Sequence, residues 1–127
     1  MPSPSVLLVE DETIVAAIEA QCLSLRGYAV DKAATGEEAV ELFSSGHAYD
    51  LLIADIELGP GIDGIETAKL IRKVGYIPVV FLTSLDRRDV RNRAEGLGNY
   101  GYVQKGTGKE PILEAVAEAL AVPREKN

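Results

Sequence analysis

The sequence is poor in cysteine, tryptophan and positive charge, and none of its hydrophobic runs is long. The single Cys22 cannot form an internal disulfide, and together with the single His47 it cannot build a zinc cluster. No apolar run approaches the roughly 20 residues needed to cross a bilayer. The first residues lack the charged segment and the apolar stretch of a signal peptide. These absences favour a cytoplasmic protein.

The charge balance limits the kinds of partner. Twenty acidic and 13 basic residues give a net charge of −7 at pH 7. Sequence-independent binding of nucleic acid needs clustered lysine and arginine, so a cation or a basic protein suits this chain better. With 127 residues and 46% hydrophobic content, we expect one domain over residues 1–127. Its core should cover about 5–121, with 122–127 a tail or the start of a linker.

Short apolar runs rich in β-branched residues alternate with segments of helical spacing. The runs cover residues 6–9, 28–30, 51–54, 78–82 and 100–103. Four stripes between them are expected to face the core, namely Ile14, Ile18, Cys22 and Leu25; Ala39, Leu42 and Phe43; Ile65, Ala68, Leu70 and Ile71; and Ile112, Val116, Ala119 and Leu120. The arginine-rich segment 85–97 reads as a further helix with a strongly solvated face. This alternation predicts an α/β fold, a parallel sheet with helices on both faces.

Residues able to do chemistry follow four of the predicted strands. Glu10-Asp11-Glu12 follow the first run, Asp55 the third, Thr83 and Ser84 the fourth, and Lys105 the fifth. In a parallel sheet these carboxyl ends share one edge, where ligands bind. Clustered carboxylates repel one another unless a cation such as Mg²⁺ lies among them. A phosphoryl group there would face the metal, a lysine and a hydroxyl, and a carboxylate can act as its acceptor.

Each of these residues also has an ordinary structural explanation. Residues 10–12 could open the first helix, where acidic side chains favour the positive end of the dipole. Asp55 could be a turn residue, Thr83 or Ser84 a helix N-cap, and Lys105 a surface lysine. Their joint placement on four strand ends, in this order, favours the chemical interpretation.

From about Ser5 to Leu120 the chain resembles a response-regulator receiver domain. Five motifs carry the resemblance, Leu7-Leu8-Val9-Glu10-Asp11-Glu12, Asp50-Leu51-Leu52-Ile53-Ala54-Asp55, Asp63-Gly64, Val79-Val80-Phe81-Leu82-Thr83-Ser84 and Gly101-Tyr102-Val103-Gln104-Lys105. The resemblance implies a (βα)5 doubly wound, flavodoxin-like fold with strand order 2-1-3-4-5.

The resemblance also implies a phosphorylation-controlled switch of a two-component phosphorelay. Asp55 would be the phosphoacceptor and, with Asp11, would bind Mg²⁺. Glu10 would hold the metal through water, and the backbone carbonyl of Glu57 would complete the protein ligands. Such a domain is no enzyme in the ordinary sense, because it catalyses only its own phosphoryl transfer and dephosphorylation.

The remaining implied roles concern signal output. Thr83 and Lys105 would contact phosphoryl oxygens, and Tyr102 would be the switch aromatic that turns inward as Thr83 moves. The implied donor is a phosphorylated histidine on a sensor kinase or a phosphotransfer protein. The implied output face covers the segment 85–97, the strand near 100–103 and the last helix, with no direct contact to nucleic acid or membrane. Whether phosphorylation drives dimerisation is left open.

The chain departs from the family pattern near the site. Gly106 stands where the family has a cis proline, and a non-proline cis bond costs roughly 2.5–4 kcal/mol, so a trans bond and a differently shaped loop are expected. The loop 56–62 is about one residue longer than usual. Glu57 and Leu85 predict an altered phosphoryl lifetime, in a direction that the sequence does not give. Ser84 replaces a smaller residue and is expected to crowd the site slightly.

Alternative functions remain beside the switch. A pseudo-receiver would keep the fold and bind partners without phosphorylation, which the complete set of site residues argues against. An aspartate-nucleophile phosphohydrolase would carry a second aspartate at the position of Glu57 and a cap insertion, which is not visible. A flavin-binding protein would need a glycine- and hydroxyl-rich phosphate loop after the first strand, where Glu10-Asp11-Glu12 would repel phosphate.

Overall fold

The computed structural model describes residues 3–122, in which strands and helices alternate strictly. In chain order they are β1 (Ser5–Val9), α1 (Thr13–Leu25), β2 (Ala29–Ala33), α2 (Gly36–Ser44), β3 (Leu51–Asp55), α3 (Gly64–Val74), β4 (Val79–Thr83), α4 (Arg87–Arg93), β5 (Gly101–Gln104) and α5 (Lys109–Ala121). All strands pair in parallel in the order β2-β1-β3-β4-β5, which confirms the predicted fold class and topology. Residues 123–127, most of the expected tail or linker, lie outside the described residues.

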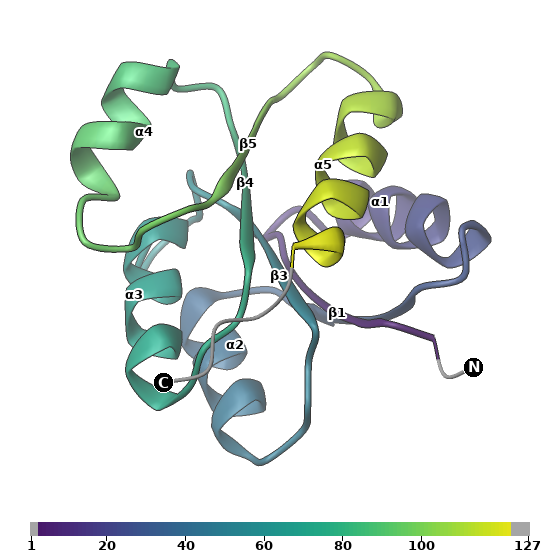
Figure 1. Cartoon of the computed structure of the whole chain (residues 1–127), viewed down its shortest axis with the longest axis horizontal. Helices are drawn as coiled ribbons and strands as arrows, with labels where there is room; N and C mark the ends of the chain where they lie inside the picture. Colours follow the sequence, from purple (N-terminus) through teal and green to yellow (C-terminus); the bar gives the residue numbers. More distant parts are fainter. Residues whose placement is uncertain (1–2, 123–127) are drawn as a thin grey trace.

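The helices form two layers around the sheet. Helices α1 and α5 cover one face, and α2, α3 and α4 cover the other (Figure 1). Because β1, β3 and β4 are covered on both sides, their residues are buried almost throughout, and only Ser5 at the start of β1 is half-buried. Strand β2 lies at the edge of the sheet, and its charged Asp31 and Lys32 are exposed. Those two charges explain why the sequence pattern ended this strand too early.

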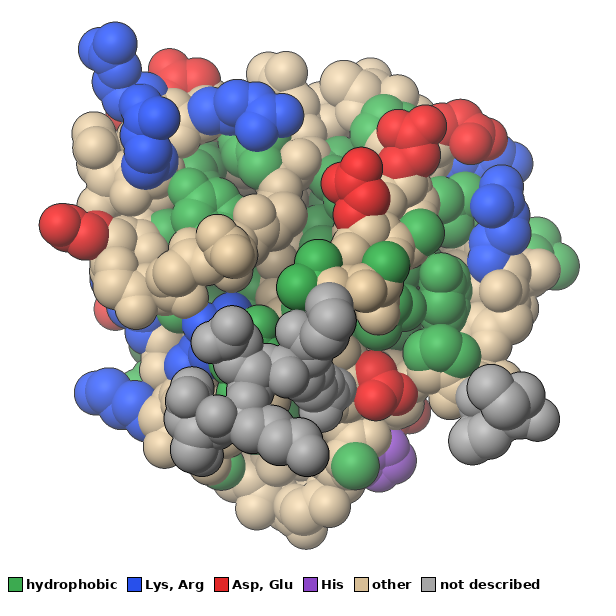
Figure 2. Space-filling view, viewed as in Figure 1, with side chains coloured by type: hydrophobic (Ala, Val, Ile, Leu, Met, Phe, Trp, Pro, Cys, Tyr) green, Lys and Arg blue, Asp and Glu red, His purple; other side chains and the backbone are tan. Residues whose placement is uncertain are grey.

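The face of helix α1 that packs against the core is opposite to the face that we expected. Its predicted apolar stripe is largely in solvent, with Ile14, Ile18 and Leu25 exposed by 75%, 57% and 78%. Ala16 and Leu23 are the buried residues of the helix instead. The expectation was wrong because α1 has apolar residues on both sides, and small side chains allow a helix to lie close to the sheet. Hydrophobic side chains accordingly gather at the surface beside α5 and α1 in Figure 2.

Helix α4 is shorter than the helix expected over 85–97, and apolar residues of this segment contact the core. Asp86 caps its N-terminus by accepting a hydrogen bond from the backbone N–H of Asp89. Val90, Ala94 and Leu97 are buried, although only Val90 lies within the helix itself. Its arginines face solvent and form part of the basic patch over α4 in Figure 2.

Helix α3 begins with a capping box. The Asp63 carboxylate accepts a hydrogen bond from the Glu66 backbone, and the Glu66 carboxylate accepts one from the Asp63 backbone. The next residue is Gly64, where a Cβ atom would lie 2.2 Å from the backbone carbonyl oxygen of Asp55. This close approach ties the start of α3 to the end of β3.

No helix in residues 3–122 is long and apolar enough to cross a membrane.

Candidate functional site

The structure brings the predicted site residues together at the carboxyl edge of the sheet. Asp55 ends β3 and Thr83 ends β4, whereas Glu10 and Lys105 directly follow β1 and β5. Asp55, Thr83 and Glu10 are buried, with 1%, 0% and 2% of their surfaces exposed. Such buried polar groups need partners or a ligand, because desolvation of a charge is costly.

Three carboxylates form a tight cluster in this edge. Glu10, Asp11 and Asp55 each offer one oxygen, and these oxygens lie within 4.8 Å of one another. One oxygen of Glu10 accepts a hydrogen bond from the Glu12 backbone at 3.1 Å, and the other, Oε1, is buried with no hydrogen-bond partner in the described structure. Burial, with a contribution from Asp55, raises the pKa of Glu10 to about 7. The cluster thus has the hard oxygen donors and the uncompensated charge that suit a divalent cation such as Mg²⁺.

Lys105 supplies the cation nearest to Asp55. Its Nζ donates a hydrogen bond to Oδ2 of Asp55 at 2.6 Å, and its backbone N–H donates to the carbonyl of Thr83 at 2.9 Å. Burial still raises the pKa of Asp55, although Lys105 opposes it. Burial would lower the pKa of Lys105, but its hydrogen bond to Asp55 and the surrounding carboxylates raise it overall.

The bond after Lys105 is trans, as expected, since residues 3–122 contain no cis peptide. Gly106 adopts a φ of +85°, a backbone conformation that glycine reaches without strain. The lysine still reaches Asp55 in this differently built loop, so the missing proline does not remove it from the site.

The side chain of Glu57 has a role in the site that sequence reasoning missed. Its carboxylate accepts hydrogen bonds from the Thr83 hydroxyl, from the Ser84 backbone N–H at 3.0 Å and from the Ser84 hydroxyl at 3.2 Å. Its own backbone N–H donates to Oδ1 of Asp55 at 3.1 Å. The sequence indicated a carboxylate beside the site, but the expected contribution of Glu57 was its backbone carbonyl.

The loop 56–62 folds toward α2 and passes beside Asp11. The Ile62 backbone N–H donates to the Glu37 carboxylate at 3.1 Å, which anchors the end of the loop. A Cβ atom on Gly59 would lie 3.1 Å from Oδ2 of Asp11. The longer loop therefore limits the space around the acidic cluster.

Thr83 is linked through Leu85 to the predicted switch aromatic. The Leu85 backbone N–H donates to the Thr83 hydroxyl oxygen at 3.0 Å. The Tyr102 hydroxyl donates to the carbonyl oxygen of Leu85 at 2.6 Å, and the guanidinium of Arg87 lies 4.5 Å from the centre of the Tyr102 ring. Tyr102 thus contacts the segment that leads into α4 and, through Arg87, the first turn of that helix.

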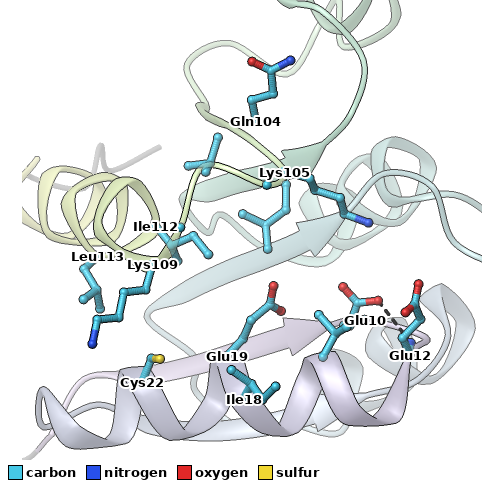
Figure 3. A pocket seen from close by; sticks show the side chains of 15 residues that line it. Glu10, Glu12, Ile18, Glu19, Cys22, Gln104, Lys105, Lys109, Ile112 and Leu113 are labelled. Carbon is cyan, nitrogen blue, oxygen red and sulfur yellow. Dashed lines mark hydrogen bonds between the residues drawn. The ribbon is translucent and has the colours of Figure 1, made fainter.

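A pocket of about 450 Å³ adjoins the acidic cluster between α1 and α5. Figure 3 shows Glu19 rising from α1 into this pocket, between Glu10 and Cys22, with Ile112 and Leu113 of α5 opposite. Burial, with a contribution from Asp55, raises the pKa of Glu19 to about 7. Its Oε1 atom has no hydrogen-bond partner among the described residues. Glu19 was not singled out from the sequence, since one acidic residue in a helix carries no positional signal.

Comparison with known proteins shows the family of this chain. A family model described as the response regulator receiver domain matches residues 6–117. The transcriptional regulatory protein PdtaR of Mycobacterium tuberculosis is 36% identical over 121 residues, which cover 94% of this chain and 58% of that protein. The uncharacterized transcriptional regulatory protein YrkP of Bacillus subtilis is 36% identical over 117 residues, which cover 91% and 48%. The chain thus spans about half the length of these curated relatives.

Solved structures resemble the whole fold. The N-terminal domain of a response regulator/sensory box/GGDEF 3-domain protein from Carboxydothermus hydrogenoformans has a TM-score of 0.84 and 40% identity, covering 91% of this chain and 93% of that one. The chemotaxis protein CheY4 of Vibrio cholerae has a TM-score of 0.84 and 25% identity, covering 93% and 99%. Receiver domains are signalling domains of two-component systems rather than enzymes with a substrate of their own. By sequence and fold, this chain belongs to the response regulator receiver family.

Proposed function

We propose that this chain is a phosphorylation-controlled switch that accepts a phosphoryl group on Asp55. The observation that carries the proposal is the buried Asp55 carboxylate, which lies in the acidic cluster and bonds the Lys105 ammonium at 2.6 Å. Asp55 is therefore a carboxylate held beside a cation, a candidate metal site and a hydroxyl. These are the groups that orient a phosphoryl group and stabilise its charge during transfer.

The proposed reaction forms one bond and breaks one. An Asp55 oxygen attacks phosphorus, and the bond from phosphorus to a histidine nitrogen of the donor breaks, leaving its electron pair on that nitrogen. Glu10, Asp11, Asp55 and the Glu57 carbonyl are proposed to hold Mg²⁺, which would neutralise charge on the phosphoryl oxygens. Lys105 and Thr83 would bind those oxygens. Water later hydrolyses the acyl phosphate, which releases inorganic phosphate and leaves the free Asp55 carboxylate.

The proposed partners are a phosphorylated histidine protein and an output element. The exposed Ile18 on α1 lines the pocket next to Glu10, and Ile14 on the same helix is also exposed, so a sensor kinase or phosphotransfer protein would have apolar surface to bury there. Tyr102 and Arg87 would pass the change at Thr83 to the face formed by α4, β5 and α5. Because PdtaR and YrkP are transcriptional regulatory proteins, the proposed output element is one that controls transcription.

Intact mass after incubation with Mg²⁺ and acetyl phosphate tests the acceptor. One phosphate adduct is expected in the wild type and in Glu12→Gln, which removes an exposed carboxylate next to the cluster. No adduct is expected in Asp55→Asn or without Mg²⁺. An adduct in Asp55→Asn would refute this acceptor, and a wild type that takes no phosphate and binds no Mg²⁺ would favour the pseudo-receiver.

A further inference from the structure

Glu57 connects two strand ends across the site. It follows Asp55 by two residues, and its backbone N–H is fixed to Oδ1 of Asp55 at 3.1 Å. From there its side chain reaches the end of β4, where its carboxylate accepts three hydrogen bonds from Thr83 and Ser84. The Glu57 carboxylate thus accepts hydrogen bonds from one buried hydroxyl, one backbone N–H and one exposed hydroxyl.

The buried hydroxyl among these donors is one that a phosphoryl group on Asp55 would use. Thr83 has one hydroxyl proton, which it donates to Glu57, and its oxygen accepts from the Leu85 backbone at 3.0 Å. A phosphoryl oxygen can therefore bond the Thr83 proton only after the Glu57 carboxylate has released it. The same holds for the Ser84 backbone N–H, which is a single donor.

The negative charge of Glu57 also opposes the binding of a phosphoryl group on Asp55. Although burial has the larger effect, the Glu57 charge also raises the pKa of Asp55, so the two carboxylates are close enough to repel. A phosphoryl group on Asp55 would add further negative charge at the same place. Two anions would then compete for one set of donors.

We propose that the Glu57 carboxylate is an internal competitor of the phosphoryl group, which must displace it from Thr83 and Ser84. The inference rests on the proposed function, because it concerns what binds at Asp55. Glu57 acts through Thr83 and the charge of the site, so it is a positioning residue. It slows phosphorylation and weakens the binding of phosphoryl-like anions.

The test compares Glu57→Gln with the wild type and with Glu12→Gln. Both residues are exposed, so both variants are expected to fold, and both remove one negative charge near the site. Only Glu57 accepts from Thr83. With Mg²⁺ present, Glu57→Gln is expected to bind beryllofluoride at least about 10-fold more tightly and to gain phosphate from acetyl phosphate faster by a similar factor. Glu12→Gln is expected to stay within about 2-fold of the wild type.

Amide NMR gives a readout that needs neither metal nor phosphate. The Ser84 amide proton, now bonded to a carboxylate, is expected to shift upfield in Glu57→Ala, whereas the amide of the distant Gly46 is not. In a Thr83→Ala background, the gain in beryllofluoride affinity from Glu57→Gln should shrink, since the contested hydroxyl is absent.

The outcomes separate this inference from the proposed function. Equal rates and affinities in the wild type and Glu57→Gln, with normal phosphorylation of both, would overturn the competition and leave the switch intact. An adduct on Glu57→Gln but none on the wild type would support the competition in its strongest form. If neither protein takes phosphate or beryllofluoride while the NMR spectra show both folded, both proposals are overturned.

Discussion

The ammonium of Lys105 and the carboxylate of Asp55 are 2.6 Å apart, although 50 positions separate them in the sequence. Asp55 is 1% exposed in its side chain and Lys105 33%, so the pair is only partly screened by water. Two further carboxylates lie beside it. The pair is therefore both a structural link between β3 and β5 and the means by which the fold tolerates three acidic groups in one place.

Removal of Lys105 should cost stability only while Asp55 is charged. We expect Lys105→Met to lower the free energy of unfolding by about 1–3 kcal/mol at pH 8 in EDTA, because it leaves a buried charge unpaired. Asp55→Asn should instead raise it, because one of the clustered carboxylates is gone. In the Asp55→Asn background Lys105→Met should have little effect. Urea unfolding of the four proteins measures this cycle, and effects that add to within about 0.5 kcal/mol would contradict the coupling.

Asp11 should account for much of the affinity for Mg²⁺. The charge count of the ligands sets the affinity of an oxygen site, so Asp11→Asn is expected to weaken Mg²⁺ binding by at least about 10-fold in calorimetric titrations. Glu12→Gln, one residue away and outside the cluster, serves as the control and should bind like the wild type. Equal losses in both variants would mean that general surface charge, rather than the cluster, attracts the ion.

Gly64 should not accept even a methyl group. A Cβ atom there would lie 2.2 Å from the carbonyl oxygen of Asp55, so Gly64→Ala is expected to cost about 3 kcal/mol and to disturb the end of β3. Gly75→Ala is the matched control, because its Cβ would meet only Phe43 at an ordinary 3.6 Å. Thermal unfolding compares the two variants, and a Gly64→Ala protein as stable as the control would show that α3 can shift freely.

Glu19 should make stability depend on pH. Its pKa is raised from 4.5 to about 7 in the folded protein, so folding favours the protonated form and stability is lost as pH rises from about 4.5 to 7. Glu19→Gln has no such loss. We expect it to be more stable than the wild type by about 1–3 kcal/mol at pH 8 and nearly equal to it at pH 4.

Unfolding in EDTA between pH 4 and 8.5 measures this difference. The variant Glu41→Gln, which removes an exposed carboxylate on α2, serves as the control for the loss of one negative charge. A constant difference between Glu19→Gln and the wild type across the range would mean that Glu19 titrates alike in the folded and unfolded chains.

The sequence predicted the central part of the fold well because its signals there are strong. Strands such as 51–55 are apolar throughout, and the Asp63-Gly64-Ile65-Glu66 box marks the start of a helix by local chemistry alone. The carboxyl ends of parallel strands lie together in any such sheet, so the meeting of Asp55 with Lys105 could be expected. Their order along the chain was sufficient for that expectation.

Features set by side-chain packing could not be predicted in the same way. Helix α1 has apolar residues all round, so spacing alone did not show that Ile14 and Ile18 face solvent. The contact of Glu57 with Thr83 depends on the path of a long loop and on a flexible side chain, neither of which leaves a pattern in the sequence. The same is true of Glu19, whose burial depends on how α1 and α5 approach each other.

The spread of the site over the whole chain has a consequence for protein synthesis. A ribosome that has just completed β3 has made Glu10, Asp11 and Asp55, but neither Thr83 nor Lys105. Until β4 and β5 are made and pair with the sheet, the three carboxylates have neither their lysine nor the threonine hydroxyl. A growing chain would therefore be unable to receive a signal early, and the capacity to respond would arise in one step, when translation has passed Lys105 and the last strand has joined the sheet.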